Sequence, residues 1–122
     1  MNNIKIFDAE FKFMCIIWDN EPIKSTELVK KANEELGWKK STTFTVIRRL
    51  CERGAISNKN TVIEALIKRE NVIIAETEEH IEKLYGGSLK LFFSTFLQKE
   101  KLTKDEIEEL IKIVQEKTGK EE

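Results

Sequence analysis

Residues 38–56 read WKKSTTFTVIRRLCERGAI and are the most informative segment of this sequence for its fold class. It has the form of a short basic helix, with Ser41 as its N-cap and Gly54 just past its end, where glycine readily adopts the left-handed conformation that stops a helix. A second short helical pattern, Ser25–Leu36, precedes it and stops at Gly37. Two short helices joined by a brief turn predict a helix-turn-helix, with residues 41–53 as the recognition helix.

The polar face of the predicted recognition helix carries hydroxyls and guanidiniums. A stripe of Thr43, Val46, Ile47 and Leu50 is expected to face the core, which leaves the opposite face and the N-terminal end free for DNA. Hydroxyls there can bind base edges or phosphates, and lysines can anchor the backbone. The predicted DNA contacts are Lys39, Lys40, Ser41, Thr42, Thr45, Arg48 and Arg49, with Lys59 from the hairpin that follows.

Simpler interpretations of these residues stay open. Thr42 and Thr45 can be plainly solvent-exposed, and Arg48 and Arg49 can form surface ion pairs with Glu52 at helical spacing. An aromatic side chain at the edge of the stripe, Phe44, can touch a thymine methyl, although packing against a neighbouring helix is the more common fate of such a residue.

The net charge of -1 hides an asymmetry along the chain. Residues 36–69 contain eight basic and two acidic side chains, a net charge of +6, whereas residues 71–122 contain eight lysines and twelve acids, a net charge of -4. A basic segment beside an acidic one is typical of a phosphate-binding surface joined to a separate module, although charge fluctuation on solvated faces is the alternative.

The neighbouring segments complete a winged helix. Asp8 can cap a first helix with a buried stripe of Phe11, Met14, Cys15 and Trp18, which Pro22 ends. Residues 55–57 and 61–65 are rich in β-branched side chains, and residues 58–60 between them read Asn-Lys-Asn. They predict a small β-hairpin wing.

Three further helical patterns follow, from residue 67 to Leu84, over residues 88–97, and from the capping box of Thr103 and Glu106. Their apolar side chains lack partners, because the first 65 residues use their own stripes to close a three-helix core. A second subunit is the expected partner, with packing on the N-terminal domain as the alternative. The predicted dimer interface consists of Leu84, Leu89, Phe92, Phe93, Phe96, Leu97, Ile107, Leu110, Ile111 and Val114.

Composition excludes several classes of protein. The sequence is 40% hydrophobic and 35% charged, which argues against disorder, and no apolar run reaches the ~20 residues of a membrane span. With no signal segment, a soluble cytoplasmic protein is expected. Cys15, Cys51 and the single histidine, His80, have neither zinc-site spacing nor the context of a nucleophile, so no metal, cofactor or enzymatic activity is expected.

Over nearly the whole chain, the sequence resembles the penicillinase repressor (BlaI/MecI) family with its copper-responsive CopY relatives. The matching residues are Asp8-Ala-Glu-Phe with Met14 and Trp18; Trp38 with Thr42, Thr45, Arg49-Leu50 and Gly54-Ala55-Ile56; Arg69-Glu70; Gly87-Ser-Leu-Lys90; Thr95-Phe-Leu97; and Lys101-Leu-Thr103. The resemblance implies a winged-helix repressor that binds palindromic operators as a homodimer and is derepressed by a membrane sensor protease that detects β-lactam antibiotics.

Departures from the family pattern are informative. Copper-responsive members carry a Cys-x-Cys motif near the C-terminus, and no cysteine follows Cys51 here, so copper sensing is not expected. The family's cleaved bond is typically Asn-Phe, and the matching position is Thr95-Phe96, which is the candidate cleavage site. Ser41 stands where a lysine is common, and the wing tip, Asn58-Lys59-Asn60, is shorter than the family's glycine-containing tip.

The sequence therefore predicts a mainly α protein with a small β-hairpin wing. A winged helix-turn-helix DNA-binding domain is expected in residues 1–66 and a helical dimerisation region in residues 67–122. The predicted function is a homodimeric transcriptional repressor of double-stranded operator DNA, in the context of antibiotic resistance. The alternative is a winged-helix module that binds an acidic protein through its basic face.

Overall fold

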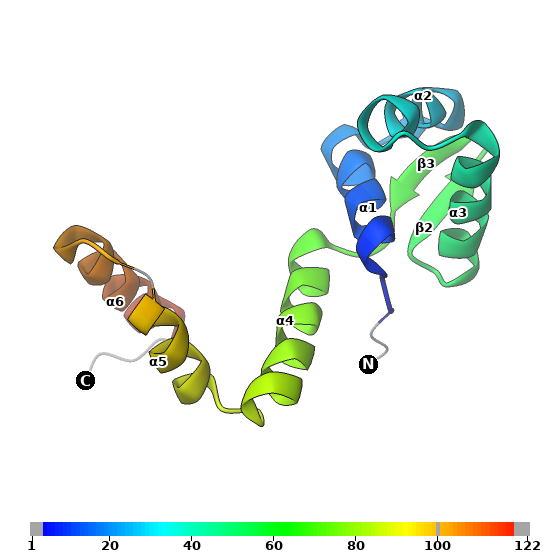
Figure 1. The fold of residues 1–122 in the computed structure, drawn as a ribbon. Coiled ribbons are helices and arrows are strands. Elements are labelled where there is room, and N and C mark those ends of the chain that lie inside the picture. Colours follow the sequence, from blue (N-terminus) through cyan, green and yellow to red (C-terminus); the bar gives the residue numbers. More distant parts are fainter. Residues whose placement is uncertain (1–3, 100, 119–122) are drawn as a thin grey trace. The chain divides into compact units, whose positions relative to one another are not determined.

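The computed structural model describes residues 4–99 and 101–118, which fall into two compact units, Met1–Thr77 and Glu78–Glu122. The first unit contains, in chain order, α1 (Asp8–Asn20), β1 (Ile23–Lys24), α2 (Ser25–Leu36), α3 (Lys40–Glu52), β2 (Ile56–Lys59), β3 (Val62–Ala65) and the start of α4 (Arg69–Tyr85) (Figure 1). The end of α4, α5 (Leu89–Lys99) and α6 (Lys104–Thr118) belong to the second unit. The predicted functional boundary after residue 66 stays a prediction.

The helix-turn-helix has the predicted form. Gly37 follows α2 with a φ of 72°, and its amide donates to the carbonyl of Asn33 at 3.0 Å, while the amide of Trp38 donates to Ala32 at 3.3 Å. Two backbone bonds closed around a left-handed glycine end the helix and reverse the chain. α3 then packs against α2, so the two helices form one structural element.

The buried face of α1 differs from the predicted stripe. Phe13, Met14 and Ile17 are fully buried, as predicted for Met14, whereas Phe11, Cys15 and Trp18, also expected inside, are only partly buried. α1 contacts both α2 and β3, so it is covered over a broader arc than a single stripe of period 3.6 would suggest. The sequence predicted the helix correctly but its buried face wrongly, and the N-cap residue is Phe7 and not Asp8 as predicted, since Asp8 is the first helical residue.

The wing belongs to a small antiparallel sheet with the strand order β1-β3-β2. In the hairpin, Lys59 pairs with Val62 across a two-residue turn, so β2 is longer than predicted, and the turn begins two residues later and ends one residue later than predicted. β1 was not predicted, because two residues are too short to show alternation; Ile23 pairs with Ile63 of β3. The sheet ties the start of α2 to the hairpin.

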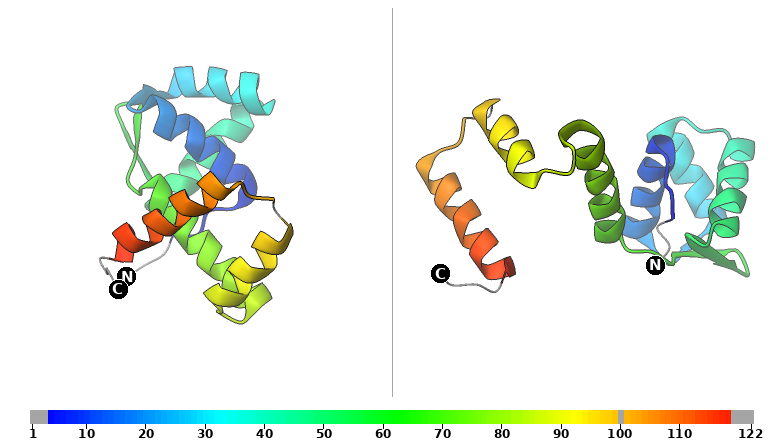
Figure 2. Two further views of the ribbon diagram at one scale, coloured as in Figure 1. Left: turned by 90° about the vertical axis from the view of Figure 1, so that its left-hand side faces the viewer. Right: turned by 90° about the horizontal axis from the view of Figure 1, so that it is seen from below.

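The core of the first unit lies between the three helices and the sheet. Its fully buried side chains come from α1, α2, α3 and both hairpin strands. α1 and α2, the blue and cyan helices of Figure 2, lie side by side and pack together. Leu28 and Ala32 of α2 and Leu50 of α3 are completely inaccessible to solvent. The fold class predicted from the sequence, mainly α with a β-hairpin wing, is confirmed.

In the second unit, three helical segments carry few buried side chains. Ile81 is the one buried residue between Glu78 and Lys117 whose side chain the structure describes. Phe92 is half-buried in an aromatic cluster, with ring centroids 5.3 Å from Tyr85, 5.1 Å from Phe93 and 5.9 Å from Phe96. This small cluster is the local packing that connects the end of α4 to α5.

Long apolar helices are lacking. Across residues 4–99 and 101–118, every helix falls short of the length and apolar character needed to cross a lipid bilayer.

Candidate nucleic-acid interface

The recognition helix α3 begins one residue earlier than predicted. Lys39, with extended backbone angles, precedes the first helical residue, and its carbonyl accepts bonds from the Thr43 amide at 3.0 Å and the Thr43 hydroxyl at 3.2 Å. Ser41 is therefore inside the first turn, and the prediction that its side chain caps the helix is wrong. No side chain caps α3, which leaves first-turn amides available to an anion.

The first turn of α3 lacks an acidic residue. α1, α2, α4 and α6 each carry acidic residues in the first turn, as helix dipoles favour, whereas α3 and α5 carry none, and α3 has Lys39 and Lys40 at its start. Cations at a helix N-terminus oppose the dipole and weaken the helix by tenths of a kcal/mol up to about 1 kcal/mol. A phosphate placed there would reverse this penalty, because it attracts both the amides and the lysines.

Trp38 fixes the approach to α3 from the core side. Its ring stacks on Phe13 of α1 at a centroid distance of 5.1 Å, and its carbonyl accepts a bond from the Asn33 side-chain amide at 3.1 Å. The start of the recognition helix is therefore fastened to both preceding helices. Sequence reasoning singled out Trp38 but not its two partners, because aromatic stacking between segments leaves no signal in spacing.

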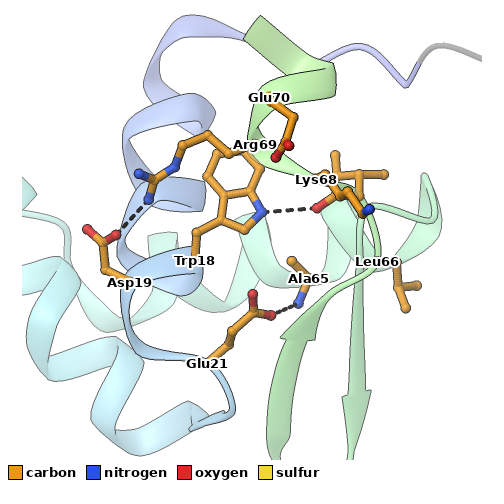
Figure 3. Close-up of a pocket in the computed structure, with 9 residues that line it drawn as sticks. Trp18, Asp19, Glu21, Ala65, Leu66, Lys68, Arg69 and Glu70 are labelled. Carbon is orange, nitrogen blue, oxygen red and sulfur yellow. Dashed lines mark hydrogen bonds and ion pairs between the residues drawn. The ribbon is translucent and has the colours of Figure 1, made fainter.

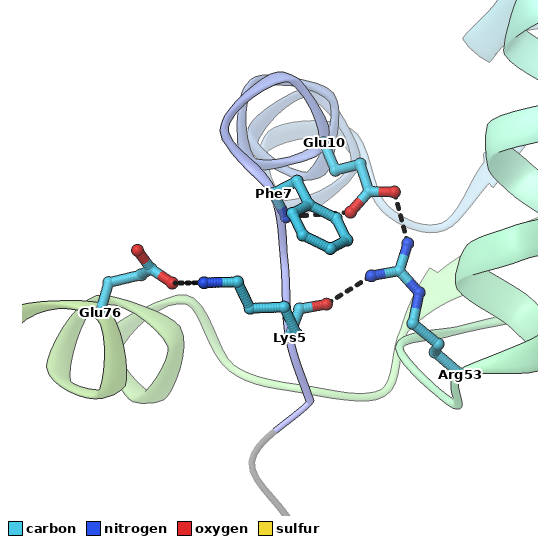
Figure 4. A network of polar contacts seen from close by, with 5 residues as sticks. All are labelled: Lys5, Phe7, Glu10, Arg53 and Glu76. Carbon is cyan, nitrogen blue, oxygen red and sulfur yellow. Dashed lines mark hydrogen bonds and ion pairs between the residues drawn. The ribbon is translucent and has the colours of Figure 1, made fainter. Parts of the chain in front are cut away.

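A polar network fastens the other end of α3 (Figure 4). Arg53 follows the last residue of α3, and its guanidinium donates to a carboxylate oxygen of Glu10 on α1 and to the carbonyl of Lys5. The other carboxylate oxygen of Glu10 accepts the Phe7 amide at 3.0 Å, and the Phe7 ring lies 5.5 Å from the Arg53 guanidinium. Glu10 thus joins the start of α1 to the end of α3.

The predicted DNA contacts lie on the solvent side of the domain. Lys39, Lys40, Ser41, Thr42, Arg48 and Arg49 are exposed on α3 or just before it, and Lys59 is exposed at the end of β2. Thr45 is intermediate, and Phe44 is 39% exposed, so it lies outside the core and keeps an aromatic face available. Thr43, Ile47 and Leu50 are buried as expected, and Val46 is partly buried against the core.

Cations in the basic segment divide into two groups. Arg53 and Arg69, counted in the +6 segment, are engaged in internal ion pairs with Glu10 and Asp19, so the basic surface is smaller than the charge count indicated. Arg48 has its Nε 3.9 Å from the Glu52 carboxylate, a long contact between exposed side chains. Such a pair contributes little and leaves Arg48 able to turn to DNA.

The wing ends in a tight turn. Asn60 and Thr61 have positive φ angles of 53° and 67°, as the two central residues of a type I′ hairpin require. Asparagine tolerates this conformation, but a β-branched threonine does so at a cost. The Thr61 carbonyl accepts the Ser25 amide at the start of α2 at 2.8 Å, which holds the turn against the helix-turn-helix. Lys59 stands directly before this turn.

The chemistry of the candidate metal ligands and of the Cys51 thiol depends on their placement and burial. Residues 4–99 and 101–118 hold no group of three histidine, cysteine or acidic side chains placed to bind a metal. Burial, with a smaller contribution from the neighbouring Glu52 carboxylate, raises the pKa of the Cys51 thiol. The thiol therefore stays protonated near neutral pH and is a poor nucleophile.

The predicted dimer contacts are largely exposed on the single chain. Phe92 is intermediate, whereas the other residues are 39% to 65% exposed: Leu84, Leu89, Phe93, Phe96, Leu97, Ile107, Leu110, Ile111 and Val114. They come from the end of α4, from α5 and from α6. Thr95 and Phe96, the predicted cleavage position, both lie inside α5 and are exposed.

A recognition helix presented by a helix-turn-helix, with a tied hairpin beside it, defines the class of winged-helix DNA-binding domains. The family model described as "Penicillinase repressor" matches residues 6–116, and the chain therefore belongs to the penicillinase repressor family, a family of transcriptional repressors rather than of enzymes.

Similar proteins agree with this assignment. The methicillin resistance regulatory protein MecI of Staphylococcus aureus strain Mu50 is 30% identical over 117 residues, which cover 93% of this chain and 95% of that protein. The penicillinase repressor of Bacillus licheniformis is 28% identical over 116 residues, covering 92% and 91%. The solution structure of the DNA-binding domain of the repressor BlaI matches with a TM-score of 0.50 and 28% identity, covering 58% of this chain and 93% of that domain.

Proposed function

We propose that this chain acts as a homodimeric transcriptional repressor that binds an inverted-repeat operator with one α3 helix per subunit. The observation that supports the DNA-binding step most directly is the start of α3, which combines uncapped amides, two lysines and two exposed hydroxyls without an acidic residue. Helix N-termini of this kind bind phosphate oxygens, and serine and threonine hydroxyls can hydrogen-bond to base edges. The likeness to the BlaI DNA-binding domain supports the same assignment.

Within this interface, the residues have different roles. Lys39, Lys40, Arg49 and Lys59 are proposed to contact phosphates and supply affinity, whereas Thr42 and Thr45 read bases. Arg48 serves either purpose once it leaves Glu52. Phosphate contacts release counterions, so affinity should fall steeply with salt concentration.

Dimer formation is proposed because the second unit cannot bury its own apolar side chains. Phenylalanines, leucines and isoleucines on α5 and α6 are exposed on the single chain, and exposed apolar side chains grouped in this way mark interaction surfaces. Burying one such side chain contributes about 1.5 to 3 kcal/mol, so a few per subunit offset the entropic cost of association. In a two-fold dimer, two α3 helices would enter successive major grooves about 34 to 36 Å apart.

The test of this function uses the upstream region of the protein's own gene as a fluorescent duplex. We expect nanomolar binding that survives an excess of random competitor DNA, and a two-subunit mass by analytical ultracentrifugation. Binding that the competitor abolishes completely would refute sequence-specific repression and favour an interaction module, since only specific recognition withstands non-specific DNA.

Derepression is proposed to follow cleavage of the Thr95–Phe96 bond by a membrane sensor protease that responds to β-lactams. The bond lies in α5, a helix of 11 residues that is short enough to open locally without support from a partner. Cleavage there would separate α6 from the rest of the chain and remove part of the proposed dimer interface. An immunoblot of N-terminally tagged protein after β-lactam exposure, with mass spectrometry of the fragment, should detect a product ending at residue 95; an intact chain in induced cells would contradict the proposal.

A further inference from the structure

The connector between β3 and α4 is held by the last turn of α1 (Figure 3). The contacts involve Ala65, the last residue of β3, Ile67 within the connector, and Arg69, the first residue of α4, through a backbone amide, a backbone carbonyl and a guanidinium in succession. Their partners are Trp18 and Asp19 in the last turn of α1 and Glu21 directly after it. We call these three contacts the connector clamp: Glu21 Oε1 accepts the Ala65 amide at 2.7 Å, Trp18 Nε1 donates to the Ile67 carbonyl at 3.0 Å, and Arg69 Nη2 donates to Asp19 Oδ1 at 2.6 Å.

The clamp is more than a set of surface ion pairs. Trp18 packs against the hydrophobic core, and the Arg69 guanidinium lies 5.3 Å above its ring, an arrangement that adds a cation–π attraction to the ion pair with Asp19. Two of the three contacts fix backbone atoms, which restrains the path of the chain itself.

A pocket lies among these residues. The three clamp contacts are made within the chain, through Glu21 Oε1, Trp18 Nε1 and Arg69 Nη2, whereas the Nε of Arg69 is buried without a hydrogen-bond partner in the part of the chain that the structure describes. The three contacts themselves restrain the connector.

The first turns of α4 are fastened beyond the clamp as well. Val72 belongs to the core of the first unit, and Glu76 is paired with Lys5 at 3.3 Å. Together with Arg69, these contacts hold one face of α4 at three successive positions. The same helix continues to Tyr85, inside the second unit.

We propose that the connector clamp is a positioning device, which restrains α4 on the first unit so that both subunits of a dimer engage their half-sites together. This inference rests on the proposed homodimeric operator binding. When two DNA-binding modules are linked, binding of the first half-site raises the effective concentration of the second module at the other half-site. The gain in affinity is largest when the link between the modules already holds them at the spacing of the half-sites. A loosened connector should lower affinity for the paired site while leaving binding to one half-site intact.

The test compares the wild-type chain with a double variant, Trp18→Phe with Asp19→Asn. Phenylalanine keeps an aromatic ring but loses the indole N–H donor, and asparagine removes the charge that pairs with Arg69. The matched control is Asp8→Asn, which neutralises another exposed acid of α1 outside the clamp. The double variant and the control each lose one negative charge, which by itself should strengthen binding to DNA. A loss of affinity in the double variant therefore cannot be caused by the change in net charge.

Three duplexes serve as probes. The first carries the inverted repeat that the wild-type protein selects from a random pool, the second carries one half-site alone, and the third carries the inverted repeat with 2 bp inserted between its half-sites. We expect the double variant to bind the paired site at least about five-fold more weakly, to bind the single half-site within about two-fold of wild type, and to discriminate less against the insertion. The control should behave as wild type. Circular dichroism and ultracentrifugation establish that each variant is folded and dimeric.

Two results would overturn the inference. Equal losses on paired and single sites would mean that Trp18 and Asp19 merely stabilise the DNA-binding unit, and an unchanged paired-site affinity would mean that the clamp restrains nothing relevant to binding. If Trp18→Phe with Asp19→Asn unfolds the protein, Arg69→Lys, which keeps the charge but loses the planar group above Trp18, is measured on the same probes against the same criteria. Failure of the wild-type chain to select any inverted repeat would refute the proposed function instead.

Discussion

Replacing Arg53 by methionine should destabilise the DNA-binding unit and loosen the end of the recognition helix. The guanidinium side chain is 28% exposed and the Glu10 side chain 12%, so this ion pair is intermediate between a surface pair and a buried one. Methionine has a similar length and keeps the packing of the stem. What it removes is the only charge partner that the described residues provide for the Glu10 carboxylate.

The expected loss follows from this partial burial. Exposed ion pairs contribute about 0 to 1 kcal/mol, whereas leaving a buried charge without its partner costs about 3 to 5 kcal/mol. Glu10 keeps its bond from the Phe7 amide, which offsets part of the cost. We therefore expect Arg53→Met to lower the free energy of unfolding by about 2 kcal/mol, and the added change Glu10→Gln to recover about 1 kcal/mol of that loss, because it removes the unpaired charge.

Urea denaturation followed by tryptophan fluorescence measures this free energy in the right part of the chain. Both tryptophans, Trp18 and Trp38, lie in the first unit, so the signal is insensitive to events in the C-terminal helices. A loss of about 2 kcal/mol moves the midpoint by about 1 to 2 M urea for a domain of this size. The control, Arg48→Met, breaks only an exposed pair 3.9 Å long and should shift the midpoint very little.

The reasoning is refuted by either of two results. One is an Arg53→Met variant as stable as Arg48→Met, which would mean that the network in Figure 4 adds nothing beyond a surface pair. The other is an additive loss in the double variant with Glu10→Gln, since residues that interact must show a coupling energy.

Four further predictions concern binding, assembly, the wing and a cysteine. Arg49→Ala should weaken binding to operator and random duplex alike, whereas Thr45→Ala should mainly reduce discrimination between them; anisotropy titrations check both, and equal losses on both DNAs for Thr45→Ala would argue against base reading. Phe96→Asp should shift the protein toward monomer by placing a charge in the apolar interface, and an unchanged mass in ultracentrifugation would reject that role. Thr61→Gly should stabilise the first unit by about 0.5 to 1 kcal/mol. Glycine avoids the penalty of about 1 to 2 kcal/mol that a branched residue has in the left-handed conformation, but it loses more backbone entropy on folding. A lower melting temperature of the variant would contradict this prediction. Because burial raises the pKa of Cys51, its alkylation by iodoacetamide should be slower than that of a free thiol at pH 7.5 and accelerate only at more alkaline pH; a rate equal to that of free cysteine would be the opposite result.

Patterns within single elements were sufficient for much of this protein. Helical periodicity and Gly37 indicated the helix-turn-helix, and β-branched residues around a polar turn indicated the hairpin, since both depend on local backbone preferences. The inward stripe of α3 was predicted because α3 has one covered face. The exposed positions of Ser41, Thr42 and the basic side chains followed from the same projection, whereas Thr45 is less exposed than the projection indicated.

Contacts between segments far apart in sequence could not be derived in this way. The rotation of α1 was mispredicted because α2 and β3 cover it together, and the two-residue β1 exists only through its pairing with β3. Arg53 and Arg69 looked like members of a DNA-binding patch until the structure placed Glu10 and Asp19 beside them. A charge count gives the number of charged side chains, but it does not show which of them form ion pairs with one another.

The sequence by itself therefore determined the local elements, the recognition helix and the residues it presents, because hydrogen bonding and amphipathicity within a helix act over three or four residues. Only the tertiary structure decided which cations remain free for DNA, how both ends of α3 are fastened and how the connector is clamped to α1. These features arise from side chains more than forty residues apart, such as Glu10 with Arg53 and Asp19 with Arg69. Their pairing depends on geometry that exists only after the core has formed.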